Sequence, residues 1–411
     1  MPVEKENNTP RIKRIVALCE VFTDGERVTA AALEYDRVID GTSLRRSSFS
    51  VAGRRITGIY TNKEPARSRL GAPGAYVIIE LSPDDEEART IVEADNDHDP
   101  DVFRKEILLQ VKQLENIRGV DGSVVPASAE ELTNDAEIDP PVDLFEHDEF
   151  RDERSEESLR YSLFRPQGYD PDRSYPLIVF IHDRGVCSRR SDLGLVQGLG
   201  GVVWAGPGEQ KKHECMVLVP HFPKAIVNDA FETTVHFELA LDLIGSIVDT
   251  YSVDRSRIYG VGQSMGTMSL LEMGIRRPDL FAGMLLAAGQ WNPATISPIA
   301  ENKIWVIVSE GDTRAYNGMN ACMDALEAVG AEISRAVWDG GIKGSEAEAL
   351  AREQKSRSGN IKYSVFRDST IVPENELKRD DIPPMLLNHM WTWRRVFTVE
   401  TLRDWLFEQV G

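Results

Sequence analysis

Residues 257–277 read RIYGVGQSMGTMSLLEMGIRR, and they set Gly-Gln-Ser-Met-Gly between an apolar strand-like run and a helical run. A serine in that setting stands on a tight strand-to-helix turn, where side chains at 262 and 266 would collide with the strand and the helix. Glycine at both positions removes the collision. Ser264 is then exposed at a helix N-terminus, which favours negative charge on its oxygen. The stretch predicts a nucleophilic serine; the alternative is a plain helix cap.

A serine hydroxyl needs a base, because it is a poor nucleophile at neutral pH. In strand–turn–helix sites of this kind, the chain order is serine, acid, histidine. His389 is the one histidine after Ser264, and we expect it in a loop formed by NHMWTW (388–393) before the closing helix. The other six histidines precede the serine and would need another chain order. The sequence therefore predicts His389 as the base.

The acid is expected after the second strand downstream of the serine. Asp312 ends the run KIWVIVSEGD (303–312), where its carboxylate could hold His389 in the productive tautomer. Glu310 and Asp339 are the rival carboxylates. We predict Asp312 as the catalytic acid.

An oxyanion hole needs two fixed backbone N–H groups. Met265, after the nucleophile, is predicted to supply the first. The second should come from the loop after PLIVFIH (176–182), with Arg184 or Asp183 as the donor. Many hydrolases have His-Gly here, whereas this chain has His182-Asp183, and His182 is interpreted as a structural residue beneath the loop.

The order of elements predicts two domains of different kinds. Residues 1–127 carry short β-branched runs, with Thr23-Asp24-Gly25 as a hairpin turn, which favours an immunoglobulin-like β-sandwich. Residues 128–158 are strongly acidic and are interpreted as a solvated linker. From 159 to 411, apolar strand-length runs alternate with helical ones, which predicts an α/β domain with a mostly parallel sheet and helices on both faces.

Composition limits the partners. The 411 residues carry a net charge of −20, which disfavours nucleic acid, and no run of 18 apolar residues predicts a membrane helix. The first residues lack a signal-peptide core, so a cytoplasmic location is expected unless a leader was removed. The four scattered cysteines predict reduced thiols and no metal site.

Three segments carry a family resemblance: residues 259–291, 305–312 and 388–409. They resemble bacterial α/β-hydrolase esterases that have an N-terminal immunoglobulin-like domain, related to the polyhydroxybutyrate depolymerase and feruloyl esterase group. Residues 28–82 also resemble the accessory domain of those esterases. The resemblance implies carboxylic ester hydrolysis by a triad of Ser264, Asp312 and His389. The chain departs from the pattern at Asp183, which replaces the glycine of His-Gly.

The predicted function is serine carboxylesterase chemistry through an acyl-enzyme, with a small-molecule ester as substrate and no metal or organic cofactor. The alternatives are a prolyl-oligopeptidase type of serine peptidase, although the repeats of a propeller are absent, and a catalytically degenerate binding scaffold. Short acyl or aryl esters are expected because an aromatic-walled cleft is predicted. The N-terminal half is expected to pack on the catalytic domain as a structural or gating element, with homo-oligomerisation left open. The residues predicted to bind substrate are Trp204, Gln263, Trp291 and Trp391, with Trp393 beside them.

Overall fold

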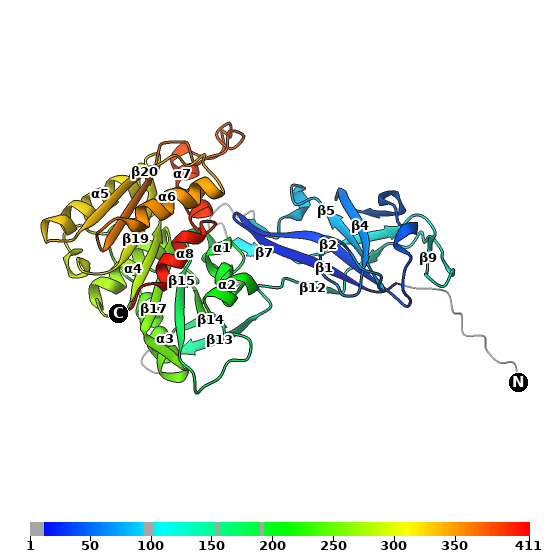
Figure 1. Ribbon diagram of the computed structural model, residues 1–411, viewed down its shortest axis with the longest axis horizontal. Helices are drawn as coiled ribbons and strands as arrows, with labels where there is room; N and C mark the ends of the chain where they lie inside the picture. The colour runs from blue at the N-terminus through cyan, green and yellow to red at the C-terminus, as the bar shows by residue number, and fades with distance from the viewer. Residues whose placement is uncertain (1–11, 94–101, 153–155, 190–192) are drawn as a thin grey trace, which may run out of the picture. The chain divides into compact units, whose positions relative to one another are not determined.

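The computed structural model describes residues 12–93, 102–152, 156–189 and 193–411. It divides into two compact units (Figure 1). The first comprises the chain up to Val92 together with Arg104–Asp143, and the second comprises Glu93–Phe103 together with Leu144–Gly411.

The first unit is a β-sandwich, as predicted. A five-stranded sheet in the order β12-β1-β2-β5-β4 shares a buried apolar core with a three-stranded sheet in the order β11-β8-β3. The Asp-Gly signal forms a hairpin, in which Phe22 pairs with Gly25. The strands of the first unit are β1 Ile12–Phe22, β2 Gly25–Tyr35, β3 Phe49–Val51, β4 Ile56–Asn62, β5 Tyr76–Leu81, β8 Gln110–Gln113, β9 Ile117–Arg118, β10 Val124–Val125, β11 Leu132–Thr133 and β12 Ala136–Ile138. Three short 3₁₀ helices (η1 Gly41–Ser43, η2 Arg46–Ser48, η3 Glu86–Ala88) and the strand pair β6 Ile91–Glu93 and β7 Val102–Arg104 complete the elements before β8.

The described residues of the acidic stretch, 128–152 and 156–158, do not form the predicted linker, and residues 153–155 lie outside the described part of the chain. β12 pairs in parallel with β1 of the sandwich, and β13 (Phe145–Arg151) pairs antiparallel with β14 (Ser158–Phe164) of the second unit. The two units divide between Asp143 and Leu144. An edge strand can expose one of its faces to solvent and carry charged side chains there. An acidic composition therefore does not exclude a strand, although it is typical of a linker.

The second unit is built on a nine-stranded sheet in the order β13-β14-β16-β15-β17-β18-β19-β21-β20. From β16 onward in that order neighbouring strands are parallel, as predicted, while β13 and β14 run antiparallel at one edge. Every residue of β15 is buried, because helices cover both faces of the sheet. The remaining strands are β15 Tyr175–Ile181, β16 Met216–His221, β17 Val253–Gln263, β18 Gly283–Ala287, β19 Ile304–Ser309, β20 Ile333–Trp338 and β21 Ile361–Phe366.

The helices lie on both faces of this sheet. Apolar residues of α3, α4 and α5 share one core with Leu177, Val179 and Ile181 of β15. On the other face Phe180 packs against Phe397, and Trp305 packs edge-on against Trp405 of α8, the red helix in Figure 1. The helices are α1 Leu199–Val202, α2 Pro207–Lys212, α3 Val235–Thr250, α4 Met265–Arg276, α5 Thr313–Ala328, α6 Ser345–Ser356, α7 Pro384–Val396 and α8 Glu400–Phe407, with 3₁₀ turns η4 Arg184–Val186, η5 Val203–Ala205 and η6 Ser297–Ile299.

The cysteines and the lengths of the helices bear on two further expectations from the sequence. All four cysteines are free thiols; three are buried and Cys187 is half-buried. Among the helices of the described segments, none combines the length and the apolar character needed to cross a membrane.

Candidate active site

Ser264 stands on the sharp turn between β17 and α4. Its backbone has φ 52° and ψ −116°, a strained conformation that a non-glycine residue rarely adopts. A Cβ at Gly266 would lie 1.9 Å from the carbonyl oxygen of Ile181, and one at Gly262 would lie 2.7 Å from the carbonyl carbon of Gly266. Both glycines are therefore required, because β17, α4 and the end of β15 approach so closely.

The structure brings the predicted triad together. Ser264 Oγ lies 2.8 Å from His389 Nε2, and His389 Nδ1 lies 2.5 Å from Asp312 Oδ2. Ser264 directly follows β17, Asp312 caps the N-terminus of α5 in the turn after β19, and His389 lies in α7. His389 is 125 residues from Ser264 and 77 from Asp312 in the sequence, and the fold of the sheet brings the three together. This arrangement can remove a proton from the serine hydroxyl and stabilise the imidazolium that results.

Asp312 is the carboxylate that reaches His389. The residue is only 1% exposed, and its Oδ1 accepts a hydrogen bond from the Ala315 N–H at the start of α5. The rival Glu310 accepts instead from the backbone N–H of Asp368, and Asp339 accepts from that of Gly341. Neither rival is bonded to the histidine.

His389 lies inside helix α7 and not in the predicted loop. The neighbouring Asn388 fixes this helix against the sheet: its Oδ1 accepts from Ser309 Oγ at the end of β19, and its Nδ2 donates to the carbonyl of Pro384. A Cβ at Gly311 would lie 2.4 Å from the Asn388 amide, so glycine is needed beside the acid. Sequence reasoning missed Asn388; its only signal was its place next to the histidine.

Trp393 is the tryptophan that contacts the triad. It follows His389 by one helical turn, and its ring meets the imidazole edge-on with centroids 5.0 Å apart. This contact restricts rotation of the imidazole about its side-chain bonds.

Two of the other predicted substrate residues, Trp204 and Trp291, are core residues and cannot form the expected aromatic-walled cleft. Trp204 is fully buried and donates its indole N–H to the carbonyl of Gly200. Trp291 is also buried and donates to Glu272. Trp391 follows His389 by two positions on α7, so it points to a different side of the helix.

Gln263 has a different place from the one predicted. It is 2% exposed, and its Nε2 donates to Asp183 Oδ2 over 2.9 Å. Asp183 Oδ1 accepts from the backbone N–H of Gly185. Asp183 stands where many hydrolases have the glycine of His-Gly. Its carboxylate therefore links the loop after β15 to the serine turn, and it also accepts the hydrogen bond that the Gly185 N–H can donate.

His182 anchors the base of the same loop, as interpreted from the sequence. Its Nδ1 lies 2.7 Å from the carbonyl oxygen of Asp183, and the Phe222 N–H donates to its Nε2. Because Nε2 accepts, Nδ1 carries the proton. Burial lowers the pKa of His182, so the ring is held neutral. Together, these contacts fix the loop that carries the candidate oxyanion donors Asp183 and Arg184.

The chain is similar to known ester hydrolases. Residues 14–126 match the family described as the esterase Ig-like N-terminal domain. A thermostable esterase of known structure has 26% identity and a TM-score of 0.81, and the match covers 97% of this chain and 100% of that one. No curated protein matches the chain. These findings confirm the immunoglobulin-like domain and support an ester hydrolase.

Two other solved structures are more distant. The feruloyl esterase module from Clostridium thermocellum, complexed with sinapinate, has 13% identity and a TM-score of 0.38 over 61% of this chain and 89% of that one. S-formylglutathione hydrolase from Staphylococcus aureus has 13% identity and a TM-score of 0.34 over 45% and 86%. Likenesses of this degree carry no argument about function.

Proposed function

We propose that this chain, whose first unit carries the esterase immunoglobulin-like domain, is a serine carboxylesterase that works through an acyl-enzyme. The observation that carries the proposal is the continuous contact from Ser264 through His389 to the buried carboxylate of Asp312. The strained serine turn supports it, since such strain persists where the surrounding structure enforces it.

The reaction follows from these contacts. His389 Nε2 accepts the hydroxyl proton as Ser264 Oγ attacks the ester carbonyl, and Asp312 stabilises the imidazolium. The Met265 N–H, with a second N–H from Asp183 or Arg184, holds the oxyanion. When the tetrahedral intermediate collapses, the alcohol leaves with the proton from Nε2. A water then attacks the acyl-enzyme by the same route in reverse and releases the acid.

Replacement of Ser264 by Ala tests this proposal. We expect kcat on p-nitrophenyl butyrate to fall about 10⁴- to 10⁶-fold, as when a triad nucleophile is removed elsewhere. A fluorophosphonate should add once to the wild-type chain and not to the variant, as read by intact mass. Ser269→Ala is the matched control, because Ser269 is a buried serine on α4 that donates to the Met265 carbonyl. Near-normal ester turnover by Ser264→Ala would exclude the mechanism.

The same assays separate the alternatives. A peptidase would cleave a peptide p-nitroanilide faster than the ester, and a degenerate scaffold would neither turn over the ester nor take the fluorophosphonate. We propose short acyl or aryl esters as the substrate class. Of the tryptophans, Trp204 and Trp291 are core residues, while Trp393 contacts His389 and is itself only 8% exposed, so the support from aromatic residues is reduced to that one contact. Faster turnover of long-chain triglyceride than of p-nitrophenyl butyrate would contradict it.

A further inference from the structure

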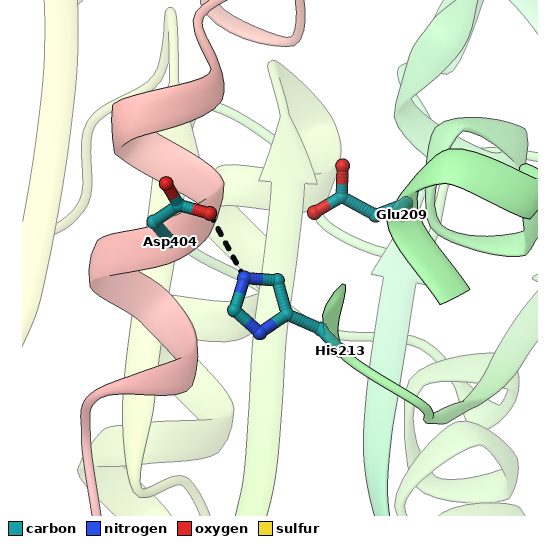
Figure 2. A group of neighbouring side chains, drawn as sticks. All are labelled: Glu209, His213 and Asp404. Carbon is teal, nitrogen blue, oxygen red and sulfur yellow. Dashed lines mark hydrogen bonds and ion pairs between the residues drawn. The ribbon is translucent and has the colours of Figure 1, made fainter. Parts of the chain in front are cut away.

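A second cluster of ionisable side chains, two carboxylates and one imidazole, lies between helices α2 and α8. Glu209 is on α2, His213 follows that helix directly, and Asp404 is on α8. One ligand atom from each lies within 4.8 Å of the other two. Figure 2 shows the two carboxylates above the same edge of the imidazole, with Asp404 to the left and Glu209 to the right. None of the three contributes to the triad.

The cluster is held in place by the backbone and by packing. The His213 N–H donates to the Glu209 carbonyl over 2.8 Å, which keeps these two side chains one helical turn apart on the same face. The His213 ring stacks on Phe407 with centroids 4.3 Å apart and planes 7° apart. Its Nε2 lies 2.8 Å from Asp404 Oδ1. The imidazole is thus fixed in position and orientation before any ligand binds.

One oxygen of Glu209 lacks a partner among the described residues. The residue is only 7% exposed; its Oε2 accepts from Arg403 over 3.0 Å, whereas its buried Oε1 accepts no hydrogen bond. A buried carboxylate oxygen without a hydrogen-bond partner is unfavourable, because it has lost its contacts with water and gained none in return. The carboxylate turns toward the imidazole (Figure 2). It is therefore positioned for a ligand that the protein itself does not supply.

The donor set selects the kind of ligand. One imidazole nitrogen and two carboxylates suit zinc and similar divalent transition ions, whereas magnesium and calcium prefer oxygen ligands throughout. Arg403 neutralises part of the negative charge but bonds the other oxygen of Glu209. The side chains of His213 and Asp404 are 22% and 36% exposed, so an ion can reach the cluster from solvent.

We propose that Glu209, His213 and Asp404 form a zinc-type divalent metal site that joins α2 to α8. The ion takes the lone pair of one imidazole nitrogen; if this is Nε2, the proton there moves to Nδ1 or to solvent, and the hydrogen bond to Asp404 is exchanged for a metal–oxygen bond. Three protein ligands leave a fourth position to water. The site would stabilise the attachment of the C-terminal helix rather than serve the triad.

Metal binding by the full chain is the first test. Protein stripped with EDTA should take up about one Zn²⁺ per chain in equilibrium dialysis, and Co²⁺ should give visible absorption bands of a low-coordinate site. Melting temperature should rise by about 5 °C or more when Zn²⁺ exceeds its Kd a hundredfold. Magnesium at the same concentration should give no rise. A wild-type chain that binds neither Zn²⁺ nor Co²⁺ would overturn the proposal.

Variants assign the ion to these residues. Asp404→Asn and His213→Gln should each weaken zinc binding by at least about tenfold and lose the Co²⁺ bands. Glu400→Gln is the matched control, because Glu400 pairs with Lys212 between the same two helices without belonging to the cluster. Ser264→Ala should bind zinc as the wild type does. Unchanged affinity and stoichiometry in both cluster variants would show that the ion binds elsewhere. If a variant fails to fold, the wild-type dialysis and Co²⁺ spectrum still decide whether the site exists.

Discussion

Replacement of Asp312 by Asn tests the acid of the proposed triad with little change in shape. In the structure, Oδ1 of Asp312 accepts from the Ala315 N–H, and Oδ2 faces His389 Nδ1. An asparagine has one oxygen, and we expect it to remain at the helix N-terminus, where only an acceptor fits. Its NH₂ group then faces Nδ1 as a donor, so His389 must carry its proton on Nε2. That tautomer cannot accept the proton of Ser264.

The expected loss follows from this change of tautomer. The same substitution in a serine protease triad lowers kcat about 10⁴-fold. At 1.36 kcal/mol for each factor of ten, the transition state loses about 5.5 kcal/mol. Asparagine caps a helix about as well as aspartate, so the free energy of unfolding should change by less than about 1 kcal/mol. The effect on kcat should therefore be far larger than the effect on stability.

The assay is kcat and KM on p-nitrophenyl butyrate from pH 6 to 9, with a urea melt of each variant. Glu310→Gln and Asp339→Asn serve as controls, because their carboxylates bond backbone N–H groups away from His389. The controls should keep kcat within about threefold of wild type, since the side-chain amide oxygen of Gln or Asn can still accept the same backbone hydrogen bond. A loss below tenfold in Asp312→Asn, or an equal loss in either control, would refute the assignment of Asp312.

Three further outcomes follow from particular contacts. Gly266→Ala should yield no folded protein, because its Cβ would lie 1.9 Å from the Ile181 carbonyl oxygen; a normal circular dichroism melt would contradict this. Gln263→Ala should lower kcat about tenfold with little change in KM, since the lost bond to the Asp183 carboxylate holds the oxyanion loop; a rise in KM alone would argue against that role. Burial, and next the nearby Glu26 carboxylate, raise the pKa of Asp139 to about 8, so the folded state keeps a proton that the unfolded state releases near pH 4. Stability should therefore fall as pH rises from about 4 to about 8, and Asp139→Asn should flatten the fall in Tm between about pH 5 and 8; equal slopes in both proteins would contradict this interpretation.

The sequence alone determined those turns and strands that depend on residues close together in the chain. Gly262 and Gly266 around Ser264 required a tight turn between an apolar run and a helical run, and the structure forms it. The Asp-Gly turn at Asp24 likewise gave the first hairpin. Chain order then limited the base to His389 and favoured Asp312, and both lie in hydrogen-bond reach.

Tertiary structure decided the features that depend on distant partners. The acidic segment became β12 and β13 because β1 and β14 offered unpaired edges, which composition does not reveal. Trp204 and Trp291 became core residues because aromatic rings distant in the sequence cover them: Phe407 packs edge-on against Trp204, and Phe231 packs edge-on against Trp291. The approach of Asn388 to Gly311 and the bond from Gln263 to Asp183 join segments about 80 residues apart. Such contacts are set by the packing of the sheet, so no local pattern in the sequence could predict them.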